Sequence, residues 1–450
     1  MEYPGAKFRR PIRLTMLILF ITAFFIISPL VILYSAGYRF DFKNGLLKET
    51  GSLSVDILPK TAAVYLEGLK IDQTLPVRLN NITPHKYTIL LSAPGYYDFE
   101  KQIEINKNQT TYIKELVLIK KDKPKLVSKD LALVTALSVS GKSLAYIIKE
   151  KNNYVVKISD EQTGSVTTVL KIADDEIPNL SWSPTGEFLA VHSKFSPYKQ
   201  FFVVNVSAIA PKVSDLALIN KSIIDKYIWS QDVEPKLHFE SGGNIYSFLP
   251  RLNNASRIAS SSFQDWYLDE GSLWTIDYIT TSKQLAIYSD TLGFKSFFAS
   301  ISENNEYASS SLKKLKLESA KKNTVVLADS ETGKFLIVKR DKYFTVNADK
   351  MFYSKFNNWL ILWNSFELWT YSENDEPYLL NRSGEKLNDI IPLDQYNTLG
   401  LLWNNEISAL YPYFYTERSI VNDKISSMTA NPDQRIIYYS NSNGIWKINY

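Results

Sequence analysis

The hydrophobic and polar residues of this chain follow three successive patterns. Residues 14–38 carry no charge and are mostly apolar. From Gly51 the apolar positions alternate with polar ones, and from Lys125 short apolar runs separated by polar turns recur as far as Tyr450. A long apolar run predicts a helix, whereas alternation with a period of two predicts half-buried strands. We therefore expect an all-β protein outside one N-terminal helix.

The apolar run predicts a transmembrane signal-anchor helix over residues 14–38. Its 25 residues, at ~1.5 Å of rise each, are enough to cross the ~30 Å hydrocarbon core of a bilayer. Pro29 lies inside the run, and membrane helices tolerate proline because other groups satisfy the carbonyl that it frees. A cleaved signal peptide is the main alternative, although its apolar region usually has only ~7 to 15 residues.

Basic residues before the run predict its orientation. Lys7, Arg9, Arg10 and Arg13 precede it and give residues 1–13 most of the formal net charge of +4. Positive flanks stay in the cytoplasm, so these four residues determine the topology. We expect a cytoplasmic basic tail at 1–13, a single span of the cell membrane, and extracytoplasmic domains after it.

Residues 50–120 predict a small antiparallel β-sandwich. Six stretches alternate between apolar and polar positions, and turn residues such as Glu67-Gly68 and Pro94-Gly95 separate them. The apolar members of these stretches are Leu53, Val55, Ile57, Val64, Leu66, Val77, Leu79, Tyr87, Ile89, Leu91, Ile103, Ile105, Leu116 and Leu118. Five or six short strands in this length suit two packed sheets.

This stretch resembles a PEGA domain. The matching residues are Pro59, Ala62, Val64, Tyr65, Gly68, Pro76, Gly95 and Tyr96. Lys60 and Thr61 depart from the pattern, because they replace the Glu and Gly of the name motif. Domains of this family are accessory modules of bacterial and archaeal surface proteins, so the resemblance implies a surface location and no enzymatic role.

A repeated turn motif predicts a β-propeller over residues 125–450. SPTGEFLAV at 183–191 and SETGKFLIV at 330–338 share Ser-x-Thr-Gly, and SVSGKSLAY begins at Ser138. Propeller blades have about 40 to 50 residues, so the region holds about seven blades, with six to eight possible. A polar stretch near 303–323 predicts a solvated insertion with little strand character.

The best copy of the repeat resembles the WD40-like repeats of TolB-type propellers. It carries the matching residues Trp182, Ser183, Pro184, Gly186, Leu189 and Ala190. Thr185 stands where that pattern has Asp. The order of anchor, PEGA-like domain and propeller resembles uncharacterised bacterial surface proteins and implies an architecture rather than an activity.

Composition excludes several kinds of chemistry. The chain has no cysteine, which excludes disulfides, thiolate nucleophiles and cysteine-ligated zinc. Beyond residue 13 the charge is close to neutral, so we expect no nucleic-acid partner. We also expect no cofactor, no metal site and no catalytic residues.

The candidate chemical groups are few, and each has a structural interpretation. The three histidines, His85, His192 and His238, form no metal motif and are interpreted as polar residues on half-exposed strands. Ser330 to Lys334 resembles part of a phosphate loop but lacks its first glycine, and is interpreted as a blade turn. The remaining candidates are the Ser-x-x-Lys matches Ser311 to Lys314 and Ser319 to Lys322, and the acidic pairs Asp174-Asp175 and Asp269-Glu270.

Aromatic residues are abundant, and they allow two interpretations. Trp266, Tyr267, Tyr411, Tyr413 and Tyr415 could stack on sugars, although blade cores use the same residue types. Core packing is the interpretation that we favour for them. Their ligand-binding role, if any, is not specified by the sequence.

Three functions are compatible with this organisation. The first is a non-enzymatic binding or scaffold protein of the bacterial cell envelope, with a protein- or glycan-binding propeller face. The second is an extracytoplasmic hydrolase or lyase acting on an envelope polymer at the propeller centre, which requires converging carboxylates or histidines there. The third, a sensor, is limited by the short cytoplasmic tail. The first is our prediction.

Overall fold

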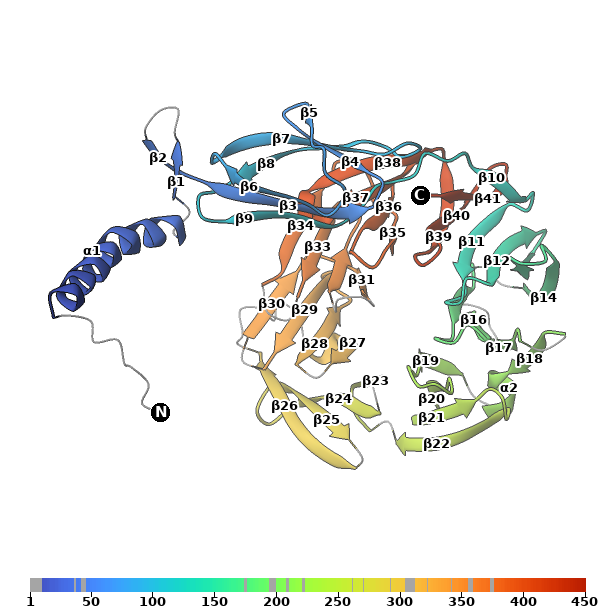
Figure 1. Cartoon of the computed structure of the whole chain (residues 1–450). Helices are drawn as coiled ribbons and strands as arrows, with labels where there is room; N and C mark the ends of the chain where they lie inside the picture. Colours follow the sequence, from blue (N-terminus) through green and yellow to red (C-terminus); the bar gives the residue numbers. More distant parts are fainter. Residues whose placement is uncertain are drawn as a thin grey trace, which may run out of the picture. The chain divides into compact units, whose positions relative to one another are not determined.

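The computed structural model describes most of the chain and divides it into two compact units, residues 1–121 and 122–450. The residues described are 10–35, 38–41, 46–173, 176–193, 200–207, 210–220, 223–260, 262–269, 271–291, 293–303, 312–321, 323–340, 342–354, 359–372 and 376–450. Figure 1 shows one N-terminal helix and otherwise almost only strands, so the predicted all-β fold class is confirmed.

Helix α1 (Arg10–Ser35) contains most of the apolar run. Its residues from 12 to 35 are apolar and long enough to cross a membrane, and none is buried by the rest of the chain. By length and composition α1 fits both a single-pass anchor and a signal sequence. Of the four basic residues, Arg10 and Arg13 lie in the first turns of α1, and Lys7 and Arg9 lie outside the described residues.

The predicted helix bounds are wrong at the C-terminal end, because α1 stops at Ser35. Tyr38 begins strand β1 (Tyr38–Asp41), which pairs antiparallel with β2 (Leu46–Glu49). The Tyr38 hydroxyl donates to Glu49 Oε1 at 2.9 Å. The absence of charge up to Tyr38 therefore extended the predicted helix into a hairpin strand.

The domain after the hairpin is built from two sheets. One has the order β6-β3-β9 and the other β5-β4-β7-β8. The strands are β3 (Gly51–Leu58), β4 (Ala63–Leu66), β5 (Leu69–Lys70), β6 (Val77–Ile82), β7 (His85–Ser92), β8 (Phe99–Ile105) and β9 (Thr110–Val117). Leu53, Val55 and Ile57 are buried at alternate positions of β3, as the pattern predicts.

The prediction of a purely antiparallel sandwich is wrong for one pair of strands. β3 and β9 pair in parallel, from Ser52 opposite Thr110 to Leu58 opposite Val117. β8 pairs with β7 in the other sheet, so the chain changes sheets between β8 and β9. A connection between sheets does not impose the antiparallel direction that a tight hairpin imposes.

The second unit consists of eight four-stranded antiparallel sheets among its described residues, which we call blades 1 to 8. Blade 1 comprises β11 (Ala132–Leu137), β12 (Ser143–Glu150), β13 (Asn153–Asp160) and β14 (Val166–Ala173). Blade 2 comprises β15 (Asn179–Trp182), β16 (Phe188–His192), β17 (Phe201–Asn205) and β18 (Lys212–Asp215), and is followed by the short helix α2 (Leu216–Asn220). Blade 3 comprises β19 (Ile224–Trp229), β20 (Leu237–Ser241), β21 (Asn244–Leu249) and β22 (Asn254–Ser260). Blade 4 comprises β23 (Asp265–Asp269), β24 (Ser272–Ile279), β25 (Gln284–Thr291) and β26 (Phe294–Ser302).

The remaining blades follow the same order. Blade 5 comprises β27 (Leu315–Lys321), β28 (Thr324–Asp329), β29 (Lys334–Lys339) and β30 (Lys342–Val346), preceded by the 3-10 turn η1 (Leu312–Lys314). Blade 6 comprises β31 (Lys350–Tyr353), β32 (Leu360–Trp363), β33 (Glu367–Tyr371) and β34 (Tyr378–Arg382). Blade 7 comprises β35 (Asp389–Pro392), β36 (Leu399–Leu402), β37 (Glu406–Tyr411) and β38 (Thr416–Asn422), with the 3-10 turn η2 (Pro412–Phe414). Blade 8 comprises β39 (Ile425–Asn431), β40 (Ile436–Asn441), β41 (Gly444–Asn449) and β10 (Lys125–Ser128).

The ring closes through blade 8, which combines the first strand of the unit with its last three. β10 pairs antiparallel with β41, and β11 lies beside β39. Figure 1 shows the blades following one another in chain order until the red strands β39 to β41 meet β10 and β11. Eight blades is the upper end of the predicted range. A closed ring leaves only short outer strands as free edges.

The repeated turns are present in the structure, but one predicted copy lies between a different pair of strands in its blade. Gly141 and Gly186 lie between the first and second strands of blades 1 and 2, with φ of +68° and +72°. Gly333, with φ of +63°, lies between the second and third strands of blade 5. The turn most like it in sequence is that of Gly164, which lies between the third and fourth strands of blade 1. The 147-residue spacing therefore did not measure a whole number of blades.

An aspartate explains why the turns of Gly164 and Gly333 are alike. Asp160 Oδ1 accepts the backbone N–H groups of residues 162 and 163, and Asp329 Oδ1 accepts those of residues 331 and 332. Each turn thus carries Asp-x-x-Thr-Gly, in which the carboxylate satisfies turn N–H groups before the glycine adopts positive φ.

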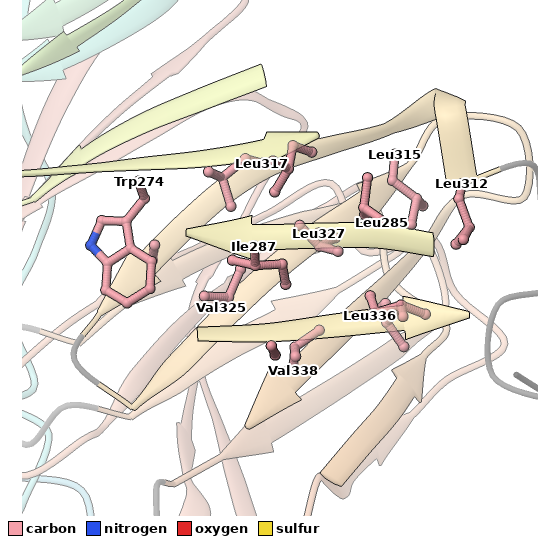
Figure 2. Packing of buried hydrophobic residues seen from close by; sticks show 14 residues of the cluster. Trp274, Leu285, Ile287, Leu312, Leu315, Leu317, Val325, Leu327, Leu336 and Val338 are labelled. Carbon is pink, nitrogen blue, oxygen red and sulfur yellow. The ribbon is translucent and has the colours of Figure 1, made fainter. Parts of the chain in front are cut away.

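Apolar side chains hold neighbouring blades together. Between blades 4 and 5, Ile276, Leu285 and Ile287 of β24 and β25 pack against Leu317, Val325 and Leu327 of β27 and β28. Figure 2 shows this cluster with Trp274 at one end and Leu312 at the other. Each fully buried aliphatic side chain contributes about 1.5–3 kcal/mol relative to its exposed state.

The predicted solvated insertion near 303–323 is wrong over its second half. Residues 312–321 form η1 and β27, and Leu312, Leu315 and Leu317 are buried in the cluster of Figure 2. The lysines between them hid the pattern that these leucines carry. Residues 304–311 lie outside the described residues.

Candidate functional site

A large cavity of the second unit lies among the first strands of its blades. It has a volume of about 1020 Å³ and is lined by residues of blades 1 to 6. Strand β19 contributes five consecutive residues, Asp225 to Trp229. The other lining residues are Val139, Ser181, Trp182, Pro184, His192, Gln231, Glu240, Gln264, Asp265, Tyr267, Lys316, Glu318 and Met351. Because blades on several sides contribute, this is the central cavity of the ring.

An ion pair joins three blades at the wall of the cavity. Lys226 Nζ of blade 3 lies 3.0 Å from Asp265 Oδ1 of blade 4 and donates to the Leu317 carbonyl of blade 5 at 2.8 Å. Asp265 Oδ2 accepts the Leu317 N–H at 2.7 Å. The Asp265 side chain is only 10% exposed, so its charge is held by these partners rather than by bulk water.

A second carboxylate at the same wall is also engaged by a neighbouring blade. Trp266 of blade 4 is fully buried and donates its indole N–H to Glu240 Oε2 of blade 3 at 2.8 Å. Lys226 Nζ lies 5.7 Å from the centroid of the Trp266 ring. Lys226, Glu240, Asp265 and Trp266 therefore form one connected group, which we call the interblade cluster.

Two further tryptophans connect blades through their indole N–H groups. Trp182 ends β15 and donates to the Ala136 carbonyl of β11 at 2.9 Å. Trp229 ends β19 and donates to the Ser181 carbonyl of β15 at 3.2 Å. The tryptophan of the Trp-Ser repeat motif thus bonds blades 2 and 3 each to the first strand of the preceding blade.

The side of the cavity near blade 2 is aromatic. His192 lies 5.1 Å from Phe201 and 5.6 Å from Tyr227, measured between ring centroids. Burial raises the pKa of Tyr227 to about 12, against a smaller opposite effect of its hydrogen bond to Ser181. Tyr227 is therefore a neutral hydroxyl at physiological pH and cannot act as a base there.

Two carboxylates that line the cavity remain exposed to solvent. They are Asp225 at the start of β19 and Glu318 in β27. The cavity thus combines two fixed carboxylates in the interblade cluster with two solvated ones, together with Lys226 and Lys316. Such a surface can offer hydrogen bonds and charge to a ligand.

The predicted half-exposed positions of His192 and His238 are wrong, because both side chains are buried. His192 lines the central cavity, and His238 lines a neighbouring cavity of about 290 Å³ beside Asp232 and Lys236. Burial lowers the pKa of His238 to about 4, opposed in part by Asp232. His85 is exposed in the other unit, edge-on to Tyr87. Within the second unit, His192 and His238 line different cavities.

The other predicted candidates are dispersed. Ser319 is buried in β27, Lys314 is exposed in η1, and Ser311 and Lys322 lie outside the described residues. Asp269 ends β23, whereas Glu270 and the pair Asp174-Asp175 are outside the described residues. Ser330 to Lys334 spans the turn between β28 and β29, as predicted.

The aromatic candidates divide between core and surface. Trp266 and Tyr411 are buried, and Tyr267 is half-buried against the cluster of Figure 2. Tyr413 and Tyr415 are exposed beside η2 and contact Trp359 and Tyr378, with ring centroids 5.2 Å and 6.1 Å apart. Core packing is confirmed for the first three only.

Sequence reasoning missed the members of the interblade cluster other than Trp266. One signal was present: Asp225 and Lys226 interrupt the otherwise apolar strand Ile224 to Trp229. A charged residue within a short core strand costs free energy unless it has a buried partner or faces a cavity. Within the parts of the chain that the structure describes, no group of three His, Cys, Asp or Glu side chains could hold a metal ion.

Comparison with known proteins identifies the small β domain. Residues 50–119 match the sequence family described as the PEGA domain. No curated protein matches the chain. The match covers the segment that contains β3 to β9 and shares its bounds with the resemblance found in the sequence.

Solved structures similar to this chain include propeller proteins. The β-propeller domain of Cps50 (Swd1) from Myceliophteria thermophila has 10% identity and a TM-score of 0.41, covering 72% of this chain and 98% of that one. Saccharomyces cerevisiae Sqt1 has 10% identity and a TM-score of 0.46, covering 73% and 98%. Kuenenia stuttgartiensis hydrazine synthase has 13% identity and a TM-score of 0.35, covering 71% and 96%.

Proposed function

We propose that this chain is a membrane-anchored, non-enzymatic binding or scaffold protein of the bacterial cell envelope. In this proposal α1 stays in the cytoplasmic membrane, the PEGA-like domain serves as a spacer, and the propeller presents a protein- or glycan-binding face outside the cytoplasm. The basic residues Lys7, Arg9, Arg10 and Arg13 support an inward N-terminus.

The observation that supports a binding role is the set of hydrogen bonds made by two carboxylates that line the central cavity. Asp265 and Glu240 accept hydrogen bonds from Lys226, Leu317 and Trp266 of adjacent blades. Both carboxylates thus have hydrogen-bond partners in neighbouring blades, which is the arrangement of structural groups at an interface between blades. These groups thus support a rigid ring, on whose rim loops can bind a partner.

Location and binding are tested on the full chain with a C-terminal tag, expressed in a bacterial host. We expect the protein to pellet with the cytoplasmic membrane and its C-terminal tag to be cleaved by protease added to spheroplasts. A variant with Lys7, Arg9, Arg10 and Arg13 changed to Glu should protect the tag, because the orientation signal is removed. A tag protected in the unchanged chain would refute the proposed topology.

The partner is sought by crosslinking in intact cells, followed by purification through the tag. We expect an envelope protein or glycan to be recovered with the anchored chain. A control with α1 replaced by a cleaved signal peptide separates capture by the propeller from capture by the membrane. Recovery of no envelope component in either form would count against a binding role.

A second candidate function rests on the exposed carboxylates of the same cavity. Asp225 and Glu318 line it together with His192, which is the kind of convergence that a hydrolase or lyase of an envelope polymer requires. Incubation of the purified chain with isolated envelope polymers tests it. Release of fragments that stops in both Asp225→Asn and Glu318→Gln would replace the binding role with catalysis.

A further inference from the structure

Blade 4 extends beyond the blade that covers it. Its strands β24, β25 and β26 have 8, 8 and 9 residues, whereas β28, β29 and β30 of blade 5 have 6, 6 and 5. The face of blade 4 toward blade 5 is apolar at Ile276, Ile287 and Ala299, all buried. Trp274 marks the end of this buried part in Figure 2.

Beyond Trp274 the same face carries hydroxyl groups in register. Trp274 lies opposite Ser289, which lies opposite Ser296, and Ser272 lies opposite Thr291. The Ser272 and Thr291 hydroxyls share a hydrogen bond of 2.8 Å, as do those of Ser289 and Ser296. Residues directly opposite in neighbouring strands point to the same face, so these hydroxyls form one polar surface.

The extension forms one wall of a groove of about 670 Å³. Arg340, in the turn between β29 and β30 of blade 5, lines it, and Asp269 lines it from the end of β23. Trp274 and Phe298 contribute aromatic rings 5.2 Å apart in edge-to-face contact. Among the lining residues that the structure describes, the charged ones are thus one acid and one base.

An exposed phenylalanine borders the groove on the outer strand of the blade. Phe294 lies opposite Thr291, on the face that carries the hydroxyls, and is 81% exposed. Phe297 also lines the groove, but it lies opposite Tyr288 and its ring contacts Tyr288 on the other face, with centroids 5.9 Å apart. A side chain of this size loses hydrophobic stabilisation when it remains in water, so the exposed ring of Phe294 beside the hydroxyl surface indicates a binding surface.

We propose that this groove is a binding site for a neutral oligosaccharide. A sugar ring has an apolar face that can lie on an aromatic side chain and a rim of hydroxyls that donate and accept hydrogen bonds. Serine and threonine hydroxyls do both, while Asp269 accepts and Arg340 donates. The balanced charge disfavours a strongly anionic polymer, and the hydroxyl lining offers no apolar pockets to anchor peptide side chains.

This inference rests on the proposed envelope function and specifies its ligand class. It is tested with the full chain, purified in a detergent that has no sugar headgroup. Titration calorimetry with chitohexaose, cellohexaose and maltohexaose at millimolar concentration is expected to detect binding of at least one. The variants Phe294→Ser and Arg340→Asn should each weaken that binding by at least about tenfold. Asparagine is chosen because residue 340 has φ of +45°, which asparagine tolerates.

The control is Phe366→Ser, which removes an exposed phenylalanine from the turn between β32 and β33 in blade 6. It should bind the saccharide as the unchanged chain does. The double variant Ser289→Ala/Ser296→Ala tests the hydroxyl row without changing an exposed aromatic residue and should also weaken binding. Unfolding temperatures of all variants verify that the propeller remains folded.

Three results would overturn the assignment. They are failure of the unchanged chain to bind any of the three hexasaccharides, binding that Phe294→Ser and Arg340→Asn leave unaltered, and dimerisation through Phe294 with no saccharide binding. Recovery of an envelope protein by crosslinking together with any of these results would retain the proposed scaffold function and reject the groove as its glycan site.

Discussion

Lys226 and Asp265 lie on different blades, and their ion pair of 3.0 Å is completed by the backbone of a third. The Leu317 carbonyl accepts a hydrogen bond from Lys226 Nζ, and the Leu317 N–H donates one to Asp265. Three successive blades are therefore connected at the wall of the central cavity by one acid and one base. Because both side chains are mostly buried, the pair should matter more than a surface ion pair.

The first prediction concerns removal of this acid. Asp265→Ala leaves Lys226 without its carboxylate and the backbone N–H groups of Trp266 and Leu317 without their acceptor. We expect the propeller to lose about 3 kcal/mol of stability. Removing one partner of a buried ion pair leaves the other charge buried without a partner, and its lost hydration is then no longer offset. Urea denaturation followed by tryptophan fluorescence measures it.

The matched control for Asp265→Ala is Glu150→Ala. Glu150 pairs with Lys171 at 3.5 Å, and both side chains are about half exposed or more. Its loss should be below about 1 kcal/mol. Equal effects of the two substitutions would contradict a structural role for the interblade cluster.

The second prediction concerns closure of the ring. Gly444 begins β41 with φ of +135°, and a Cβ added there would lie 2.2 Å from the Ser128 carbonyl oxygen of β10. Gly444→Ala must therefore displace β10, and we expect a loss of about 3 kcal/mol. Hydrogen exchange should show faster exchange of the β10 and β41 amides.

Gly164→Ala is the control that separates the effect of disturbing ring closure from the effect of backbone strain. Gly164 also has positive φ, +71°, but has no atom within 4 Å of an added Cβ. Its substitution should cost about 1–2 kcal/mol and leave exchange in β10 unchanged. If Gly444→Ala behaved in the same way, the closing role of β10 would be refuted.

The third prediction concerns pH. Burial lowers the pKa of His238 to about 4, and Nδ1 of this side chain has no hydrogen-bond partner within the described structure. In the unfolded chain His238 takes up a proton below about pH 6.5. In the folded chain it does so only near pH 4. Stability should therefore fall by about 3 kcal/mol as the pH drops through this window, and level off below it.

His238→Gln tests this linkage, since glutamine does not titrate. The slope of unfolding free energy against pH should decrease between pH 4 and 6.5 in this variant. His85→Gln, at an exposed position of the other unit, is the control for replacing a histidine by glutamine. An unaltered slope in His238→Gln would show that other groups cause the acid sensitivity.

The fourth prediction concerns the independence of the two units. Leu53→Ala removes a side chain that is 1% exposed in β3 and should destabilise the small domain by about 2–5 kcal/mol. Hydrogen exchange should accelerate in residues 51–119 and not in residues 122–450, because they form separate compact units. Leu69→Ala, at a 73% exposed position, serves as the control. Accelerated exchange in the propeller would reveal coupling between the units.

Local patterns predicted the elements well wherever one residue type controls the conformation. Alternation at Leu53, Val55 and Ile57 predicted β3, and the glycines at 141 and 186 predicted turns between the first two strands of their blades. The predictions were wrong where the same local pattern fits two different structures. Tyr38 extended an uncharged run without being helical, and the lysines between Leu312 and Leu317 made a core strand look like a solvated loop.

The sequence by itself determined that this chain has an apolar N-terminal helix, a PEGA-like domain and a propeller, because periodicity and turn chemistry act over a few residues. Only the tertiary structure decided that the ring has eight blades and that β10 completes the last, since Lys125 and Lys447 meet only when the ring closes. It alone also decided that Lys226 meets Asp265, because contacts between blades depend on residues dozens of positions apart, which no local pattern records.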